Sequence, residues 1–266
     1  MGEPTEYEPG AFCWVGLATS DPVGAKAFYA RLFGWTSDEP AAGDPGAYTI
    51  LRRNGREVAI LYRQTAEARA AGAPPHWTSF VSVADADATA ARAGKLGGAA
   101  VFREPFDVRG EGRVAAIRDP SGAMLSLWQP RARAGAALVN DVGAFCWNEL
   151  VTPDVNRCRS FYGDLFGWRY RSGDGDTIIE NAGRLVGSMR EPTGQDRGVS
   201  PDWLPYLGVE HADDAARRAE QSGGHRVTPT SEAPIGRFAV LADPQGAVFA
   251  VREGPYAPRP ARAHSG

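Results

Sequence analysis

This chain contains the same sequence pattern twice. Residues 11–35 read AFCWVGLATSDPVGAKAFYARLFGW and residues 144–168 read AFCWNELVTPDVNRCRSFYGDLFGW, with 13 of the 25 positions identical at a constant shift of 133. A second pair of segments agrees at a shift of 124, where residues 112–123 share the letters GR…DPxGA with residues 236–247. The chain is therefore a tandem duplication, and its fold and function have to be understood as two related halves.

The length and net charge of the chain limit the classes of protein to which it can belong. A length of 266 residues suits two domains of about 125 residues each. The net charge of −3 gives no electrostatic reason to expect nucleic acid or an anionic membrane as a partner. No apolar run approaches the roughly 20 residues of a membrane helix, and the start, MGEPTEYEPG, lacks the features of a secretory signal. The odd number of cysteines (Cys13, Cys146 and Cys158) indicates reduced thiols, so we expect a cytoplasmic protein.

The pattern over residues 10–65 predicts a β-α-β-β-β unit. Alternation over residues 12–17 indicates a strand in which Phe12, Trp14 and Gly16 share one face. Asp21-Pro22 is typical of a helix start, and Gly34 of a helix end. Three more strands are expected at Trp35 and at residues 47–52 and 57–62, with Asn54-Gly55 as the hairpin turn.

The same order recurs three more times. A second unit is expected over residues 77–129, and the second half repeats both units over 144–190 and 203–253. Residues 65–75 and 191–202 are predicted to be loops. The domain prediction is a first domain at 8–129, a linker at 130–142, a second domain at 143–254 and a flexible tail at 255–266. The fold class expected is α+β, with four β-α-β-β-β units.

The motifs FYxxLFGW and GR…DPxGA, in this combination and in this order, resemble the vicinal oxygen chelate superfamily, which includes glyoxalase I, extradiol dioxygenases and bleomycin-binding proteins. The resemblance covers about residues 10–253 and is greatest to tandem glyoxalase-like proteins of actinobacteria. It implies that the two units of each half join into a curved mixed sheet that forms a cup around a small ligand. A tandem protein carries two such cups.

The resemblance also implies where a metal ion would bind, and this sequence departs from the pattern there. The first ligand of the family, seven residues before the Asp that starts the helix, corresponds to Trp14 and Trp147. The other ligand positions correspond to Thr78, Leu204, Ser126 and Ala250. A transition-metal site needs several His, Glu or Asp side chains that converge. We therefore expect no metal and no other cofactor.

Strand alternation predicts which side chains face the cups. The first cup is expected to hold Trp14, Phe80 and Trp128 and to be apolar, with His76 at its rim. The second is expected to hold Trp147, Glu149, Tyr206 and Arg252, an acid, a phenol and a cation around an indole. The two tryptophans of the repeat, Trp14 and Trp147, have an alternative role as core packing.

Glu149 is the most informative of these residues, because a buried acid is costly unless it is paired or protonated. Either it neutralises an arginine, Arg237 or Arg252, or it is an acid/base with a raised pKa. The candidate catalytic residues are Glu149, Tyr206 and Arg237. Arg237 has an alternative role in supporting its hairpin. The candidate substrate-binding residues are Trp14, Phe80, Trp128, His76, Trp147, Asn148 and Arg252.

Three functions remain open. The first is an enzyme that needs no metal and performs acid–base chemistry (isomerisation, cyclisation or elimination) on a small apolar or aromatic metabolite of specialised metabolism. The second is a binding protein of the bleomycin-resistance type that sequesters such a compound. The third is a metal-dependent glyoxalase-like lyase with unusual ligands such as His76 and Glu149. In each case the partner is a small molecule, and the protein is a monomer or a homodimer.

Overall fold

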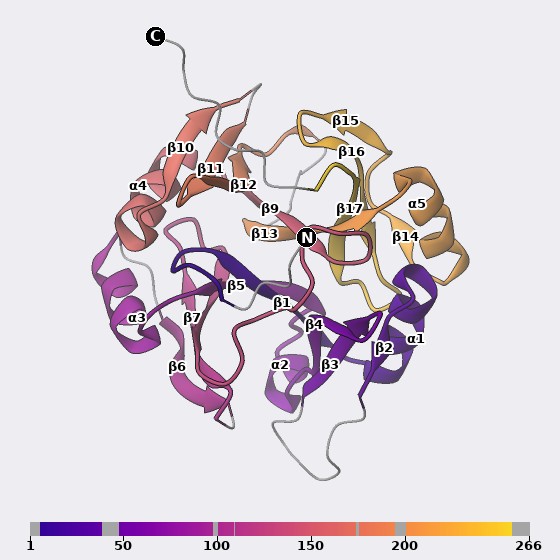
Figure 1. Ribbon diagram of the computed structural model, residues 1–266, viewed down its shortest axis with the longest axis horizontal. Helices are drawn as coiled ribbons and strands as arrows, with labels where there is room; N and C mark the ends of the chain where they lie inside the picture. Colours follow the sequence, from indigo (N-terminus) through magenta and orange to yellow (C-terminus); the bar gives the residue numbers. More distant parts are fainter. Residues whose placement is uncertain are drawn as a thin grey trace.

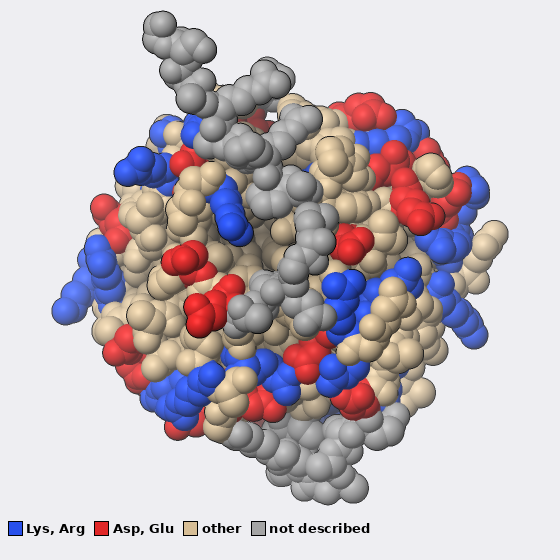
Figure 2. All heavy atoms as spheres, in the orientation of Figure 1, with Lys and Arg blue, Asp and Glu red and all other residues tan. Residues whose placement is uncertain are grey.

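The computed structural model describes residues 6–38, 48–97, 101–108, 110–173, 176–194 and 201–256. The predicted α+β class is confirmed: the chain folds into two large curled mixed sheets, with short helices on their flanks (Figure 1). None of the helices in these residues is long and apolar enough to cross a membrane. Lys, Arg, Asp and Glu side chains are interspersed over the face shown in Figure 2. Most of the predicted tail, from residue 257 on, lies outside the described residues.

The first half forms a sheet of eight strands in the order β2-β3-β4-β1-β5-β8-β7-β6. Its elements are β1 Phe12–Thr19, α1 Pro22–Phe33, β2 Thr36–Ser37, β3 Tyr48–Arg53, β4 Arg56–Arg63, α2 Ala66–Ala70, β5 His76–Ser82, α3 Ala86–Lys95, β6 Val101–Val108, β7 Gly112–Arg118 and β8 Met124–Pro130. The one added element is α2, which begins in the predicted loop because the Thr65 hydroxyl accepts a hydrogen bond from the amide of Ala68.

The second half repeats this arrangement in the order β10-β11-β12-β9-β13-β17-β16-β14, with β15 paired to β16. Its elements are β9 Phe145–Val151, α4 Val155–Phe166, β10 Arg169–Ser172, β11 Thr177–Asn181, β12 Arg184–Arg190, β13 Asp202–Val209, α5 Ala212–Gln221, β14 His225–Arg226, β15 Ser231–Ala233, β16 Gly236–Ala242 and β17 Val248–Glu253. In each half the two units join through their first strands, β1 with β5 and β9 with β13, which run antiparallel.

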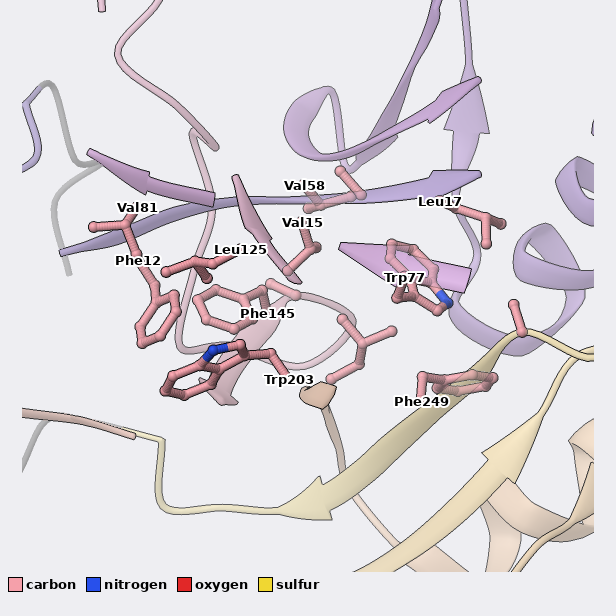
Figure 3. Packing of buried hydrophobic residues seen from close by; sticks show 14 of the residues in the cluster. Phe12, Val15, Leu17, Val58, Trp77, Val81, Leu125, Phe145, Trp203 and Phe249 are labelled. Carbon is pink, nitrogen blue, oxygen red and sulfur yellow. The ribbon is translucent and has the colours of Figure 1, made fainter. Parts of the chain in front are cut away.

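A single hydrophobic core lies between the two sheets. One continuous cluster of buried residues takes members from both halves, including Phe12, Trp77, Phe145, Trp203 and Phe249 (Figure 3). The helices pair across the halves, α1 with α5 and α3 with α4 (Figure 1). The two halves are therefore stabilised by the same core, and each sheet turns its other, concave face away from it.

Two matching hydrogen-bond chains cross this core. The Trp77 indole donates to the Tyr29 hydroxyl at 3.0 Å, which donates to Asp243 of the other half at 3.1 Å. In the same way the Trp203 indole donates to the Tyr162 hydroxyl at 2.9 Å, and Tyr162 donates to Asp119 at 3.0 Å. The Tyr comes from the FYxxLFGW motif and the Asp from the DPxGA motif of the other half. The two motifs of the repeat are thus the two sides of one interface.

The first strand of each half contains a bulge that changes the predicted facing. In β1 the register shifts between Phe12 and Trp14, so that Cys13 is an extra residue, and in β9 Cys146 occupies the same place. Cys13 and Trp14 both belong to the cluster inside the first cup, whereas Phe12 packs in the core between the sheets. The prediction that Phe12 and Trp14 share a face is therefore wrong, because strict alternation does not hold across a bulge.

The crossing hydrogen bonds predict a matched pair of destabilising substitutions. Tyr29→Phe leaves the buried Trp77 indole and Asp243 carboxylate without this partner, so the free energy of unfolding should fall by about 1–3 kcal/mol, and Tyr162→Phe should act alike. Tyr170→Phe is the control: its hydroxyl is buried and has no hydrogen-bond partner among the described residues, so its loss should cost less than about 0.5 kcal/mol. Urea unfolding of the three variants measures this. Equal losses in all three would contradict the assignment.

Candidate functional site

The cup of the second half contains a cavity of about 310 Å³. Its walls come from the sheet, from the segment before β9, from the β15–β16 hairpin and from the residues after β17. They are Asn140, Cys146, Trp147, Ile178, Leu185, Ala233, Pro234, Ile235, Gly236, Arg252, Pro255 and Tyr256. Most of these side chains are apolar, as in the pockets that hold small organic ligands. The thiol of Cys146 donates to the Tyr206 carbonyl at 3.3 Å, and burial raises the pKa of this thiol to about 12, so it stays protonated at neutral pH.

Arg252 is the charged residue on the cavity wall. Only 6% of it is exposed, and its guanidinium carbon lies 5.9 Å from the ring centre of Trp147 and 5.7 Å from that of Tyr256. Its Nη2 donates to the Pro255 carbonyl at 2.7 Å. The cation is therefore held between two aromatic rings at one end of the cavity.

A buried polar network lies next to the cavity, on the same face of the sheet. Glu149 is 5% exposed and accepts hydrogen bonds from Arg190 at 3.0 Å, from the Tyr206 hydroxyl at 3.2 Å and from Ser188 at 3.4 Å. Ser188 in turn accepts the indole N–H of Trp147 at 3.1 Å. Glu149 is not one of the wall residues; it is connected to the wall through Ser188 and Trp147.

Burial controls the protonation of this network. Removal from water raises the pKa of the Glu149 carboxyl, and the nearby Arg190 guanidinium opposes this effect only in part. Burial, followed by the Glu149 charge, holds the pKa of the Tyr206 hydroxyl well above its usual range. Burial also raises the pKa of Asp176, which lies near enough to disfavour the charge on Glu149. The site therefore combines a carboxyl that binds its proton more tightly than usual with a phenol that stays neutral.

The first cup has none of these polar groups. Strand register places Gly16 where the second half has Glu149, Ile60 in place of Ser188, Phe80 in place of Tyr206, and Trp128 in place of Arg252. Trp14, Phe80 and Trp128 are each at most 5% exposed and pack together. Arg133, whose carbonyl accepts from the Trp128 indole, pairs with Glu57 and Glu111 beside this aromatic cluster.

The chain itself fills the first cup. Tyr7 and Ala136 pack against its aromatic cluster, and the Tyr7 hydroxyl donates to the Ala136 carbonyl at 2.6 Å. The Ala136 amide donates to the Cys13 carbonyl at 2.8 Å, and the Trp128 indole donates to the Arg133 carbonyl at 2.9 Å. Part of the linker between the halves is therefore bound inside the first cup.

The structure brings four of the predicted site residues together, Trp147, Glu149, Tyr206 and Arg252. Arg237 lies elsewhere: it points to the α5 side of β16, where it pairs with Asp213 at 2.6 Å and Glu232 at 3.0 Å. These contacts fit the alternative role of Arg237, in which it supports its hairpin.

Asn148 and His76 also lie outside the second cup. Asn148 is fully buried on the core face of β9, where it accepts a hydrogen bond from Ser79 of the other half at 2.5 Å. His76 begins β5 in the first sheet and its Nδ1 lies 3.0 Å from the Pro74 carbonyl. His76 and Glu149 thus belong to different sheets.

Two residues of the network, Ser188 and Arg190, were not predicted from the sequence. Both are on β12, which pairs with β9 so that Ser188 lies opposite Glu149. The signal that could have found them is the alternation of β12, which places Ser188 and Arg190 on the same face. The parallel register that aligns them with Glu149 is set by contacts distant in sequence.

Both halves match models of known families. The model of the Glyoxalase/Bleomycin resistance protein/Dioxygenase superfamily matches residues 12–127, and that of the glyoxalase-like domain matches residues 145–252. The chain belongs to this superfamily, as its motifs predicted, with one such domain in each half.

The relatives and structural neighbours extend over the whole chain. CFP32 of Mycobacterium tuberculosis, which carries the name of a glyoxylase, is 37% identical and covers 94% of this chain and 97% of its own. The anthracycline biosynthesis protein DauV of Streptomyces sp. strain C5 is 34% identical, with 94% and 95% covered. Two solved structures share the fold: the 2,3-dioxygenase LapB of Pseudomonas sp. KL28 (TM-score 0.66, 12% identity, 97% of each chain) and the Mn(II)-bound glyoxalase of Novosphingobium aromaticivorans (TM-score 0.62, 17% identity, 92% and 82%).

The residues of this chain do not fit a metal ion of the family type. In the second cup the expected ligand positions hold Trp147, whose only polar atom donates to Ser188, and Leu204 and Ala250, whose side chains have no ligating atom. Within the described ranges, no three His, Cys, Asp or Glu side chains are grouped so that they could hold a metal ion. Glu149 is engaged by Arg190, Tyr206 and Ser188 instead.

The raised pKa of Glu149 predicts a pH dependence of stability. The native state keeps this proton at pH values where an unfolded glutamate, with a pKa of 4.5, has released it. The stability of the protein relative to its Glu149→Gln variant should therefore fall, by on the order of 1 kcal/mol, as the pH rises through the native pKa, and should then level off. Urea unfolding of both proteins between about pH 4.5 and pH 8 measures this. A difference that moves in favour of the unmodified protein with rising pH would show that Arg190 outweighs burial.

Proposed function

We propose that the second cup binds a small, flat, largely apolar metabolite and that the protein acts on it in specialised metabolism. The observation that carries the proposal is the asymmetry of the halves: the cavity, with Trp147 in its wall, and the Glu149 network occur together in one cup, while Tyr7 and Ala136 pack into the other. A cavity of about 310 Å³ suits a compact ring system. The 34% identity to the anthracycline biosynthesis protein DauV supports an aromatic metabolite.

The chemistry that we propose is a proton transfer by Glu149. Burial raises the pKa of the Glu149 carboxyl, so it holds a proton more tightly than an exposed glutamate and could both accept and return one, as an isomerisation, cyclisation or elimination requires. Tyr206 and Arg190, which both donate to Glu149, would stabilise its charged form, in which it takes a proton from one atom of the ligand; the neutral acid then returns this proton to another atom of the same ligand or to the leaving group. Trp147 would stack on the ligand and orient it.

A second candidate is binding without chemistry. It is favoured by the position of Glu149, which is not among the described residues that line the cavity and has its partners within the protein. In that case the network fixes the shape of the cup, and the protein sequesters its ligand. Mass spectrometry of a compound that co-purifies with the protein separates the two candidates: an altered compound after incubation supports the enzyme, and an unchanged compound supports the binding protein.

The proton-transfer proposal predicts the effect of Glu149→Gln. This variant keeps the size of the side chain and one accepting oxygen but cannot transfer a proton, so turnover of the co-purified compound should fall by about 10²- to 10⁴-fold while its affinity stays within a few fold. The matched control is Glu180→Gln, which removes another buried glutamate of the same sheet, paired with Arg171 at 2.6 Å. Turnover should survive in the control. Full turnover in Glu149→Gln would end the assignment.

A further inference from the structure

The second cup contains a positive charge that has no negative charge beside it. Arg252 is 94% buried and lies on the cavity wall, yet no carboxylate of the described residues comes within 4.0 Å of its guanidinium. The other arginines near the cups do have such partners: Arg190 pairs with Glu149 at 3.0 Å, and Arg133 with Glu111 at 2.8 Å. Arg252 therefore differs from these arginines in having no carboxylate partner among the described residues.

The rings beside Arg252 compensate for its burial only in part. A guanidinium that leaves water loses strong solvation, and contact with the faces of Trp147 and Tyr256 recovers some of it. An opposite charge would recover more. The site thus forms without a ligand. Its largest uncompensated electrostatic interaction is the one that Arg252 would make with a ligand in the cavity.

The hydrogen bonds of Arg252 leave donors free. Its Nη2 donates to the Pro255 carbonyl at 2.7 Å and its Nε is 3.5 Å from the Glu253 carbonyl, while Nη1 has no hydrogen bond to a described residue. The guanidinium group has a planar fork of N–H donors that matches the two oxygens of a carboxylate. The unused part of this fork is available to a ligand whose acidic oxygen lies in the plane of a ring stacked nearby.

The repeat shows that this charge is specific to the cup with the cavity. The position of Arg252 is occupied in the first half by Trp128, whose indole donates to the linker carbonyl of Arg133. Where the chain fills the cup, an aromatic residue packs against it; where a cavity is left, an arginine faces it. The remaining wall is almost entirely apolar.

We propose that the ligand of the second cup is an aromatic acid, with its ring against Trp147 and its anionic oxygen, a carboxylate or a phenolate, paired with Arg252. The inference rests on the proposed binding site and adds the charge of the ligand. It makes Arg252 the residue that selects anions over neutral compounds of the same shape.

Isothermal titration of the full chain with anthracene-2-carboxylate and with anthracene-2-carboxamide tests this. The two probes have the same ring and nearly the same shape but differ in charge. The carboxylate should bind at least about 10-fold more tightly than the amide. In Arg252→Gln the two affinities should become equal within about 3-fold, whereas Arg252→Lys should retain part of the preference. 2-Hydroxyanthracene, titrated below and above its pKa of about 10, measures separately whether a phenolate is preferred to its neutral form.

The outcomes separate this inference from the proposed function. Equal affinities of the two probes in the unmodified protein would overturn the selection of anions while leaving an aromatic site in the cup. Binding of neither probe would overturn both. A preference that persists in Arg252→Gln would assign it to another residue and also overturn the inference. The control, Arg113→Gln, removes an arginine of the first half that is paired with Asp87 and Asp107, and should keep the full preference. Circular dichroism shows that each variant is folded.

Discussion

The structure depends on the packing of two sheets against each other through one shared core. The apolar faces of β1 and β5 meet those of β9 and β13, and the Trp–Tyr–Asp hydrogen bonds cross from each half into the other. Because Tyr29 needs Asp243 and Tyr162 needs Asp119, neither half has satisfied buried polar groups by itself. The duplication therefore produced two halves that complete each other. The residues of the two shared motifs are those that the interface between the halves requires.

This packing leaves each sheet with a concave face that the core does not use. The same geometry gives two cups, but their covalent surroundings differ: the first cup is followed by the linker, and the second by residues after β17. The linker packs into the first cup on its way to the second half, and Ala136 hydrogen-bonds there to Cys13. Filling one cup with the chain's own residues removes it as a ligand site without disturbing the shared core.

The sequence allowed the fold and part of the site to be predicted, for physical reasons that differ from residue to residue. Helix caps, turns and alternation are local, so the four units could be recognised, and Glu149 stood out because an acid in a buried strand is costly. The facing of Phe12 failed at the bulge, which is a property of the pairing with β5. Ser188 and Arg190 were missed because they join Glu149 only through the register of β12. Arg237 was predicted as a possible partner of Glu149, whereas its repetition in both halves favoured a role at the hairpin, and both copies of this arginine pair with acidic side chains outside the cups.

The two buried charged side chains of the second cup, Glu149 and Arg252, differ in whether an opposite charge lies beside them, and this difference organises the site. Glu149 is buried beside Arg190, which offsets part of the cost of its charge, and its proton affinity is set by the fold. Arg252 is buried without one, so its electrostatic energy is lowered by whatever anion enters. A ligand attracted by Arg252 would lie on Trp147, whose indole is connected through Ser188 to Glu149. The binding charge and the titratable group are thus linked to the same tryptophan, Arg252 at its ring and Glu149 through Ser188.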